Sequence, residues 1–192
     1  MLPILTIFIV FIVVLTFYIK KNESAQEQIN NEFWEKERKS NAVRKQDISK
    51  LDYITIPWDK IPYPVDTETE KEFFSFSQKP MLNLTGISNT DLKLMYGTAN
   101  LDILSAYDTN FTDMVAVLPK YATELLEAGQ RELAVELLEF AVGCNADSKR
   151  IWLLLAELYR ETKDTAKLDW LRQASDKLPN LTKLAVQKEL IC

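Results

Sequence analysis

The sequence contains no histidine and has only four glycines and two cysteines among its 192 residues. Without histidine the chain lacks the commonest general base and the commonest metal ligand of proteins. No glycine-rich loop that would cradle a phosphate is present, and two cysteines far apart in the sequence, with no histidine, do not indicate a zinc site. Cys144 lies within a predicted helical region and Cys192 is the last residue, so a disulfide framework is not expected either. Asp102, Asp108 and Asp113 offer carboxylates, but aspartates at loops and helix caps are ordinary. We therefore expect no enzyme, no cofactor and no metal ion.

An excess of positive charge is also missing, because 23 Lys and Arg stand against 28 Asp and Glu, a net charge of −5. Nucleic-acid-binding proteins gain much of their affinity by neutralising phosphates with Lys and Arg. A nucleic-acid partner is therefore not expected. The hydrophobic content of 47 % is enough for a packed domain, and the length suits one domain with an appendage.

One long apolar run is present, from residue 2 to residue 19, without a charged side chain. A helix of this length spans about 27 Å at 1.5 Å per residue, close to the hydrocarbon core of a bilayer. Tyr18, Lys20 and Lys21 follow at the position of a membrane interface, and no small-residue cleavage site follows the run. The pattern predicts an uncleaved single-pass anchor over residues 1–19, in contact with the lipid bilayer. The positive flank predicts a cytoplasmic C-terminal domain.

Four Asn-x-Ser/Thr triplets, beginning at Asn22, Asn83, Asn110 and Asn180, leave an alternative open. Such triplets accept N-linked glycans on proteins outside the cytoplasm, so an anchored extracytoplasmic domain is a second hypothesis. Asn, Ser and Thr also gather where helices begin, which explains the same triplets without modification. We favour the capping explanation.

The chain between the apolar run and the C-terminal third divides into three segments. Residues 20–46 are polar, with a thin stripe of Ala25, Ile29 and Phe33, and they predict a helical stalk. Residues 47–66 contain several prolines and predict an extended strap lying on the helical body, or alternatively a free proline-rich docking motif. Residues 67–110 predict short capping helices that end in a loop at 107–110.

Large and small apolar residues recur at a spacing of 34 between residues 111 and 192, as in the pair Leu118 and Trp152. The first unit has Leu118, Tyr121, Ala122, Leu125, Gly129, Ala134 and Ala141, and the second has Trp152, Leu155, Ala156, Tyr159, Ala174 and Pro179. This pattern resembles the tetratricopeptide repeat family, whose helical hairpins stack into a solenoid. The expected fold is accordingly all-α: a transmembrane helix, then a repeat-like solenoid with capping helices. The plan also resembles anchored helical-repeat proteins of Gram-positive bacteria.

The resemblance implies a peptide-binding groove lined by the first helix of each hairpin. The positions of this groove are Thr123, Glu127, Arg150, Leu153, Glu157, Arg160 and Glu161. The basic clamp for an acidic C-terminus is absent, since Pro119 and Leu153 occupy positions where basic residues would stand. We expect a membrane-anchored scaffold that binds an unknown protein or peptide. The alternatives are the outward-facing domain and a structural subunit of a larger membrane complex without a groove ligand; the oligomeric state stays open.

Overall fold

The computed structural model describes residues 2–60 and 66–191, without the side chains of residues 2–6, 24, 25 and 191. Part of the strap and Cys192 therefore lie outside the described residues, as does the side chain of Ala25. The described chain is helical and contains no strand, which confirms the all-α expectation for these residues. The α-helices are α1 (Leu2–Asn41), α2 (Glu68–Phe74), α3 (Asn89–Tyr96), α4 (Leu101–Glu127), α5 (Arg131–Gly143), α6 (Lys149–Glu161), α7 (Thr165–Ala174) and α8 (Asn180–Ile191). Short 3₁₀ turns are η1 (Ser75–Gln78), η2 (Thr98–Asn100) and η3 (Ser175–Lys177).

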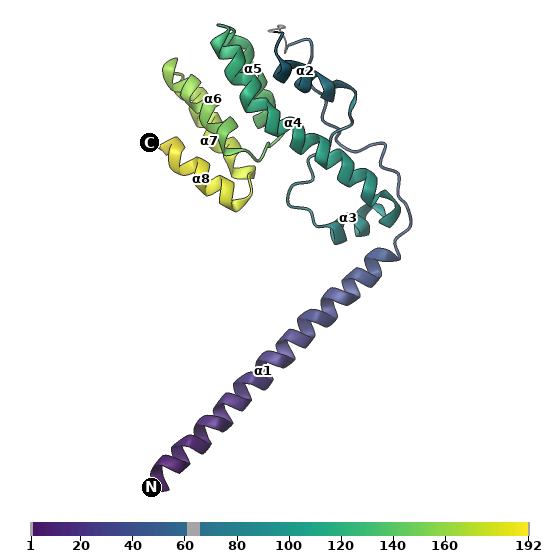
Figure 1. Ribbon diagram of the computed structural model, residues 1–192, viewed down its shortest axis with the longest axis vertical. Helices are drawn as coiled ribbons and strands as arrows, with labels where there is room; N and C mark the ends of the chain where they lie inside the picture. The colour runs from purple at the N-terminus through teal and green to yellow at the C-terminus, as the bar shows by residue number, and fades with distance from the viewer. Residues whose placement is uncertain (1, 61–65, 192) are drawn as a thin grey trace. The chain divides into compact units, whose positions relative to one another are not determined.

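The chain forms two compact units. Unit 1 comprises Met1–Asp47 with Ser88–Leu101, and unit 2 comprises Ile48–Ile87 with Asp102–Cys192. Unit 1 is built from α1 and α3, whereas unit 2 contains the helices from α5 to α8, drawn from green to yellow in Figure 1. Each unit is described separately below.

Helix α1 is one uninterrupted helix of 40 residues, drawn from purple to blue in Figure 1. It contains no glycine, and its only proline, Pro3, lies in the first turn, where a missing N–H costs little. Hydrogen bonds between polar side chains stabilise the second half of the helix; for example, the Gln28 amide donates to the Glu32 carboxylate one turn later (3.0 Å). The backbone therefore shows no break at residue 19, where we expect an anchor to end and a stalk to begin.

Across the described residues, no helix combines the length and the apolar character that crossing a membrane requires. The prediction of a single-pass anchor is thus wrong. The membrane flank of Tyr18, Lys20 and Lys21 and the cytoplasmic topology inferred from it are wrong with it.

The core of unit 2 is a single apolar cluster to which α2, α4, α5, α6, α7 and α8 contribute. Helix α6 lies against α5, α7 and α8, and its apolar face is buried. Small residues lie where helices meet, since Ala122, Ala134, Ala141 and Ala156 are fully buried. Leu118, Tyr121, Leu125, Trp152, Leu155 and Tyr159 are buried with them, whereas Ala174 and Pro179 are half-buried. Gly129 is exposed in the turn between α4 and α5, with a φ of +75°.

Helix α4 runs without a break from Leu101 to Glu127, so the expected loop at 107–110 and the domain boundary after residue 110 are wrong. The polar segment Tyr107–Asn110 contains neither glycine nor proline, and Leu104, Phe111 and Met114 continue one buried helical stripe through it. Polar side chains inside a helix misled the prediction. Thr109 is exposed and donates to the Ser105 carbonyl, and the Tyr107 ring packs edge-on against Tyr53. Asp108 and Asn110 bond to the backbone of Leu84 and Pro80.

The described part of the strap lies on the body of unit 2. Ile56 is buried in the apolar cluster, and the Ile54 N–H donates to the Met81 carbonyl (2.9 Å). The Trp58 ring stacks on Phe74, with centroids 4.7 Å apart. These contacts tie the strap to the turn that follows α2.

Candidate functional site

The residues predicted to line a peptide groove lie on α4 and α6. Glu127, Arg150 and Glu157 are exposed, and Leu153 is half-buried. The Thr123 hydroxyl donates within its own helix to the Pro119 carbonyl (2.8 Å). The two charges at the end of α6 bond to neighbouring helices: Arg160 donates to the Glu189 carbonyl on α8 (2.6 Å), and Glu161 pairs with Arg131 on α5 (2.5 Å). Those two side chains are therefore engaged within the protein.

A charged cleft of about 520 Å³ opens on another surface, between α5, the end of α6 and the start of α7. Its lining residues are Arg131, Glu132, Val135, Glu136, Glu139, Leu158, Tyr159, Thr162, Asp164 and Lys167, of which only Tyr159 was singled out in the sequence. Glu139 accepts hydrogen bonds from the Tyr159 hydroxyl (2.6 Å) and from Lys167 (2.8 Å). Burial, aided by the Glu139 hydrogen bond, raises the pKa of Tyr159. These internal pairs make the cleft a packing feature of the helical body.

The side chains of Cys144 and Asp108, which could in principle take part in catalysis, are held by contacts within the folded protein. Burial raises the pKa of the Cys144 thiol to about 11, with a smaller contribution from Asp52, so the thiol stays protonated near neutral pH. Asp108 accepts a hydrogen bond from the Leu84 N–H (2.9 Å) and fixes the segment before α3. Among the described residues, no group of three Cys, Asp or Glu side chains is placed to hold a metal ion.

Two of the four Asn-x-Ser/Thr asparagines use their amide groups inside unit 2. The Asn83 amide donates to the carbonyls of Cys144 (2.8 Å) and Asn145 (3.2 Å), and the Asn110 amide donates to the Pro80 carbonyl (3.0 Å). Asn180 is the first residue of α8, and Asn22 lies within α1. The amide nitrogen is the atom that a glycan would modify, so the folded protein engages that atom at Asn83 and Asn110.

The largest exposed apolar surface of the described chain lies on α1. Its side chains, which we call the α1 apolar surface, are Ile7, Phe8, Ile9, Val10, Phe11, Ile12, Val13, Val14, Leu15, Phe17, Tyr18 and Ile19. Their exposed fractions range from 44 % at Ile12 to 69 % at Ile7, and consecutive residues point in all directions around the helix. The one polar residue within the run, Thr16, donates its hydroxyl to the Ile12 carbonyl (2.8 Å), so the helix satisfies it internally.

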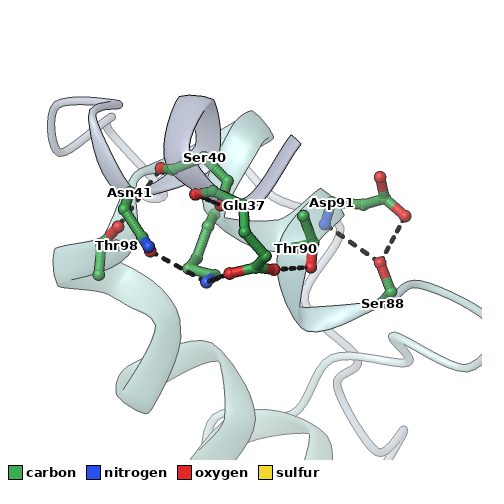
Figure 2. A network of polar contacts seen from close by, with 8 residues as sticks. Glu37, Ser40, Asn41, Ser88, Thr90, Asp91 and Thr98 are labelled. Atoms are coloured by element: carbon green, nitrogen blue, oxygen red, sulfur yellow. Dashed lines mark hydrogen bonds and ion pairs between the residues drawn. The ribbon is translucent and has the colours of Figure 1, made fainter. Parts of the chain in front are cut away.

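The other end of α1 is held by a polar junction with α3, which Figure 2 shows. The Glu37 carboxylate accepts from Lys93 Nζ (2.5 Å) and from the Thr90 hydroxyl, and Lys93 also donates to Asn41 (3.0 Å). The side chains of Glu37 and Lys93 are only 19 % and 12 % exposed, so this ion pair is screened less than a surface pair. We call Glu37, Lys93, Thr90 and Asn41 the α1–α3 junction.

The junction makes the stability of unit 1 depend on pH. The Lys93 and Thr90 hydrogen bonds hold the pKa of Glu37 below its ordinary value of 4.5, and the Lys36 and Ser88 contacts lower the pKa of Asp91 from 3.8. A lowered folded-state pKa contributes stability above the unfolded-state pKa, and this stability is lost as pH falls through the folded-state value. We expect protection of the α3 amides in hydrogen exchange to be constant above about pH 5.5 and to fall below pH 4. Glu37→Gln should flatten this dependence, and an unchanged profile in that variant would contradict the assignment.

Residues 1–52 match one protein family, described as Orf76 (Ac76). The match covers the whole of α1, including its apolar surface and Glu37. No curated protein and no solved structure matches the chain.

This finding corrects the resemblance drawn from the spacing. The matched family is not a tetratricopeptide repeat family, and the match lies at the opposite end of the chain from the residues with the 34-residue period. The likeness to tetratricopeptide repeats, and with it the likeness to anchored repeat proteins of Gram-positive bacteria, is therefore wrong. The α1–α3 junction was missed altogether, since no local signal links Glu37 to a lysine 56 positions later.

Proposed function

We propose that this chain is a non-catalytic structural subunit of a protein assembly, in which helices of other protein chains cover the α1 apolar surface. The observation that carries the proposal is the exposure of twelve large apolar side chains between Ile7 and Ile19. A helix that is apolar on all sides is a buried helix in its functional state. Exposed apolar patches of this kind mark interaction sites.

The size of the driving force supports a protein environment around α1. Complete burial of one large apolar side chain contributes roughly 1.5–3 kcal/mol, so covering this surface contributes on the order of 10 kcal/mol or more before the cost of association. A two-helix pair buries chiefly the a and d positions of each heptad. Because the residues of α1 are apolar all round, more than one neighbouring helix is needed to cover them.

The helical body supports a structural role over a groove-binding role. Arg160 and Glu161, two of the residues expected to contact a peptide, already bond to α8 and to Arg131. A ligand that used them would first have to break these contacts. The matched segment, residues 1–52, also contains the α1 apolar surface and none of the helical body from α4 to α8.

Site-specific photo-crosslinking in cells that make the protein tests the proposal. We expect a benzophenone amino acid in place of Phe11 to form adducts with other polypeptide chains, whereas the same probe at Trp170, which is 42 % exposed on α7, should form few. Replacing Ile9 and Val13 by lysine should reduce the Phe11 adducts at least about tenfold, because a charge cannot be buried there without a partner. Equal adduct yields at Phe11 and Trp170, or yields that the lysines do not change, would contradict the proposal.

A further inference from the structure

Unit 2 has a second surface feature, a groove of about 340 Å³ between the strap and the turn that follows α2. One wall is formed by Tyr53, Ile54, Thr55, Ile56 and Trp58, and the other by Phe76, Ser77, Gln78, Lys79, Pro80 and Met81. We call this feature the strap groove. Its floor is apolar because Ile56, Phe76 and Met81 belong to the buried core.

Backbone hydrogen bonds and ring packing hold the two walls in place. The Ile54 N–H donates to the Met81 carbonyl (2.9 Å), and the Lys79 N–H donates to the Phe76 carbonyl (3.1 Å). Trp58 stacks on Phe74, so the indole is fixed against the helix that precedes the groove. A groove built in this way exists before a ligand arrives, which reduces the entropy cost of binding.

The electrostatic character of the strap groove differs from the rest of the chain. Its lining contains one cation, Lys79, and neither aspartate nor glutamate, although the chain carries 28 acidic residues. Lys79 is exposed, and its Nζ lies 4.6 Å from the centroid of the Phe76 ring, directly at the apolar floor. The charged cleft between α5 and α6, by contrast, is lined by Glu132, Glu136, Glu139 and Asp164.

We propose that the strap groove binds an acidic linear peptide of a partner protein. A large apolar side chain of the peptide rests on Ile56, Phe76 and Met81, and a neighbouring carboxylate pairs with Lys79. The volume is at the low end for ligand sites and accommodates one or two side chains, not a folded helix. The exposed side chains of Thr55, Ser77 and Gln78 along the rim supply hydrogen-bonding groups for a peptide backbone. The strap groove and the α1 apolar surface share no residue, so this proposal does not depend on what covers α1.

Fluorine NMR of the full-length chain labelled with 5-fluorotryptophan tests the proposal, because Trp58 lines the groove. The probes are the peptides acetyl-Asp-Leu-Phe-Glu-amide and acetyl-Lys-Leu-Phe-Lys-amide, and Trp58→Phe identifies the resonance. The acidic peptide should shift the Trp58 signal with a Kd below about 1 mM, and the basic peptide should bind at least about tenfold more weakly.

Substitution of the rim cation separates groove binding from non-specific contact. Lys79→Glu should weaken binding of the acidic peptide at least about tenfold and strengthen binding of the basic peptide. Lys177 is an exposed lysine outside the groove, so Lys177→Glu should leave both Kd values unchanged. Raising the salt concentration from about 50 to 300 mM should also weaken binding to the unaltered chain, because a partly exposed ion pair is screened. No saturable shift of Trp58, equal binding of both peptides, or an unchanged Kd in Lys79→Glu would overturn the proposal.

Discussion

Trp152→Ala is expected to lower the free energy of unfolding of unit 2 by about 4 kcal/mol, the largest effect of any single change considered. The Trp152 side chain is completely buried within the apolar cluster. Its Nε1–H donates to the Ala146 carbonyl (2.9 Å), which fixes the turn between α5 and α6. Truncation therefore leaves a cavity and removes one of the two hydrogen bonds that the Ala146 carbonyl accepts, the other coming from the Ser148 N–H (3.0 Å). Urea denaturation followed by circular dichroism measures the loss.

Trp170→Ala provides the matched control, because Trp170 is 42 % exposed on α7. Trp170→Ala should lower the free energy of unfolding by no more than about 1 kcal/mol. The loss of unfolding free energy in Trp152→Phe should lie between those of the two alanine variants, since phenylalanine keeps much of the packing but not the hydrogen bond. A loss at Trp152 no larger than that at Trp170 would show that the cluster around α6 is not the core of unit 2.

Gly97→Ala is expected to destabilise unit 1 by about 3 kcal/mol or more. Gly97 ends α3 at φ +84° and ψ 148°, a region that side-chain-bearing residues rarely adopt. A Cβ atom there would lie 2.4 Å from the Arg44 carbonyl oxygen, so the two segments would have to separate. The bonds that join them, from the Gln46 N–H to the Tyr96 carbonyl (3.0 Å) and from the Asn100 amide to the Gln46 carbonyl (2.8 Å), would then be lost.

Tryptic cleavage after Arg44 and Lys45 reports this separation, and its rate should rise at least about tenfold in Gly97→Ala. Gly86→Ala controls for backbone strain alone, since Gly86 has a φ of +85° but no atom within 4 Å of the added Cβ. That substitution should cost only about 1 kcal/mol and leave the cleavage rate nearly unchanged. Equal effects of the two substitutions would contradict the close approach at Gly97.

Local helix signals in the sequence are reliable where a side chain acts on its own turn. Thr67 accepts from the Glu70 N–H at the start of α2, and Ser88 accepts from the Asp91 N–H at the start of α3. Both caps follow from residue type and spacing alone. The continuity of α4 does not, because Tyr107–Asn110 is polar and Pro119 lies inside the helix, and only the packing of Phe111 and Met114 decides the outcome.

The spacing of 34 residues shows how a pattern can indicate packing without indicating a family. Ala122 and Ala156 are both buried, as such a pattern requires, since any two helices that approach closely need a small residue at the contact. Antiparallel helices joined by short turns generate similar spacings for this reason alone. A family resemblance built on these positions therefore had little specificity.

The candidate site was less accessible to prediction than the helices. Hydropathy identifies the apolar run of α1, but what covers a run of apolar residues is not a local property of the sequence. The ion pair between Glu37 and Lys93 joins residues far apart in the chain, and the strap groove depends on the pairing of Ile54 with Met81. Long-range contacts of this kind need the folded structure.

Hydrogen exchange at the backbone amides of residues 7–19, in the full-length protein isolated together with its bound chains, tests the central claim most directly. If other helices cover the α1 apolar surface, these amides should exchange at least about 100-fold more slowly than those of residues 26–32, which lie on the exposed polar half of the same helix. Replacing Ile9 and Val13 by lysine should abolish the difference. Equally fast exchange in both segments of the unaltered protein would show that α1 stands uncovered and would contradict the proposed role.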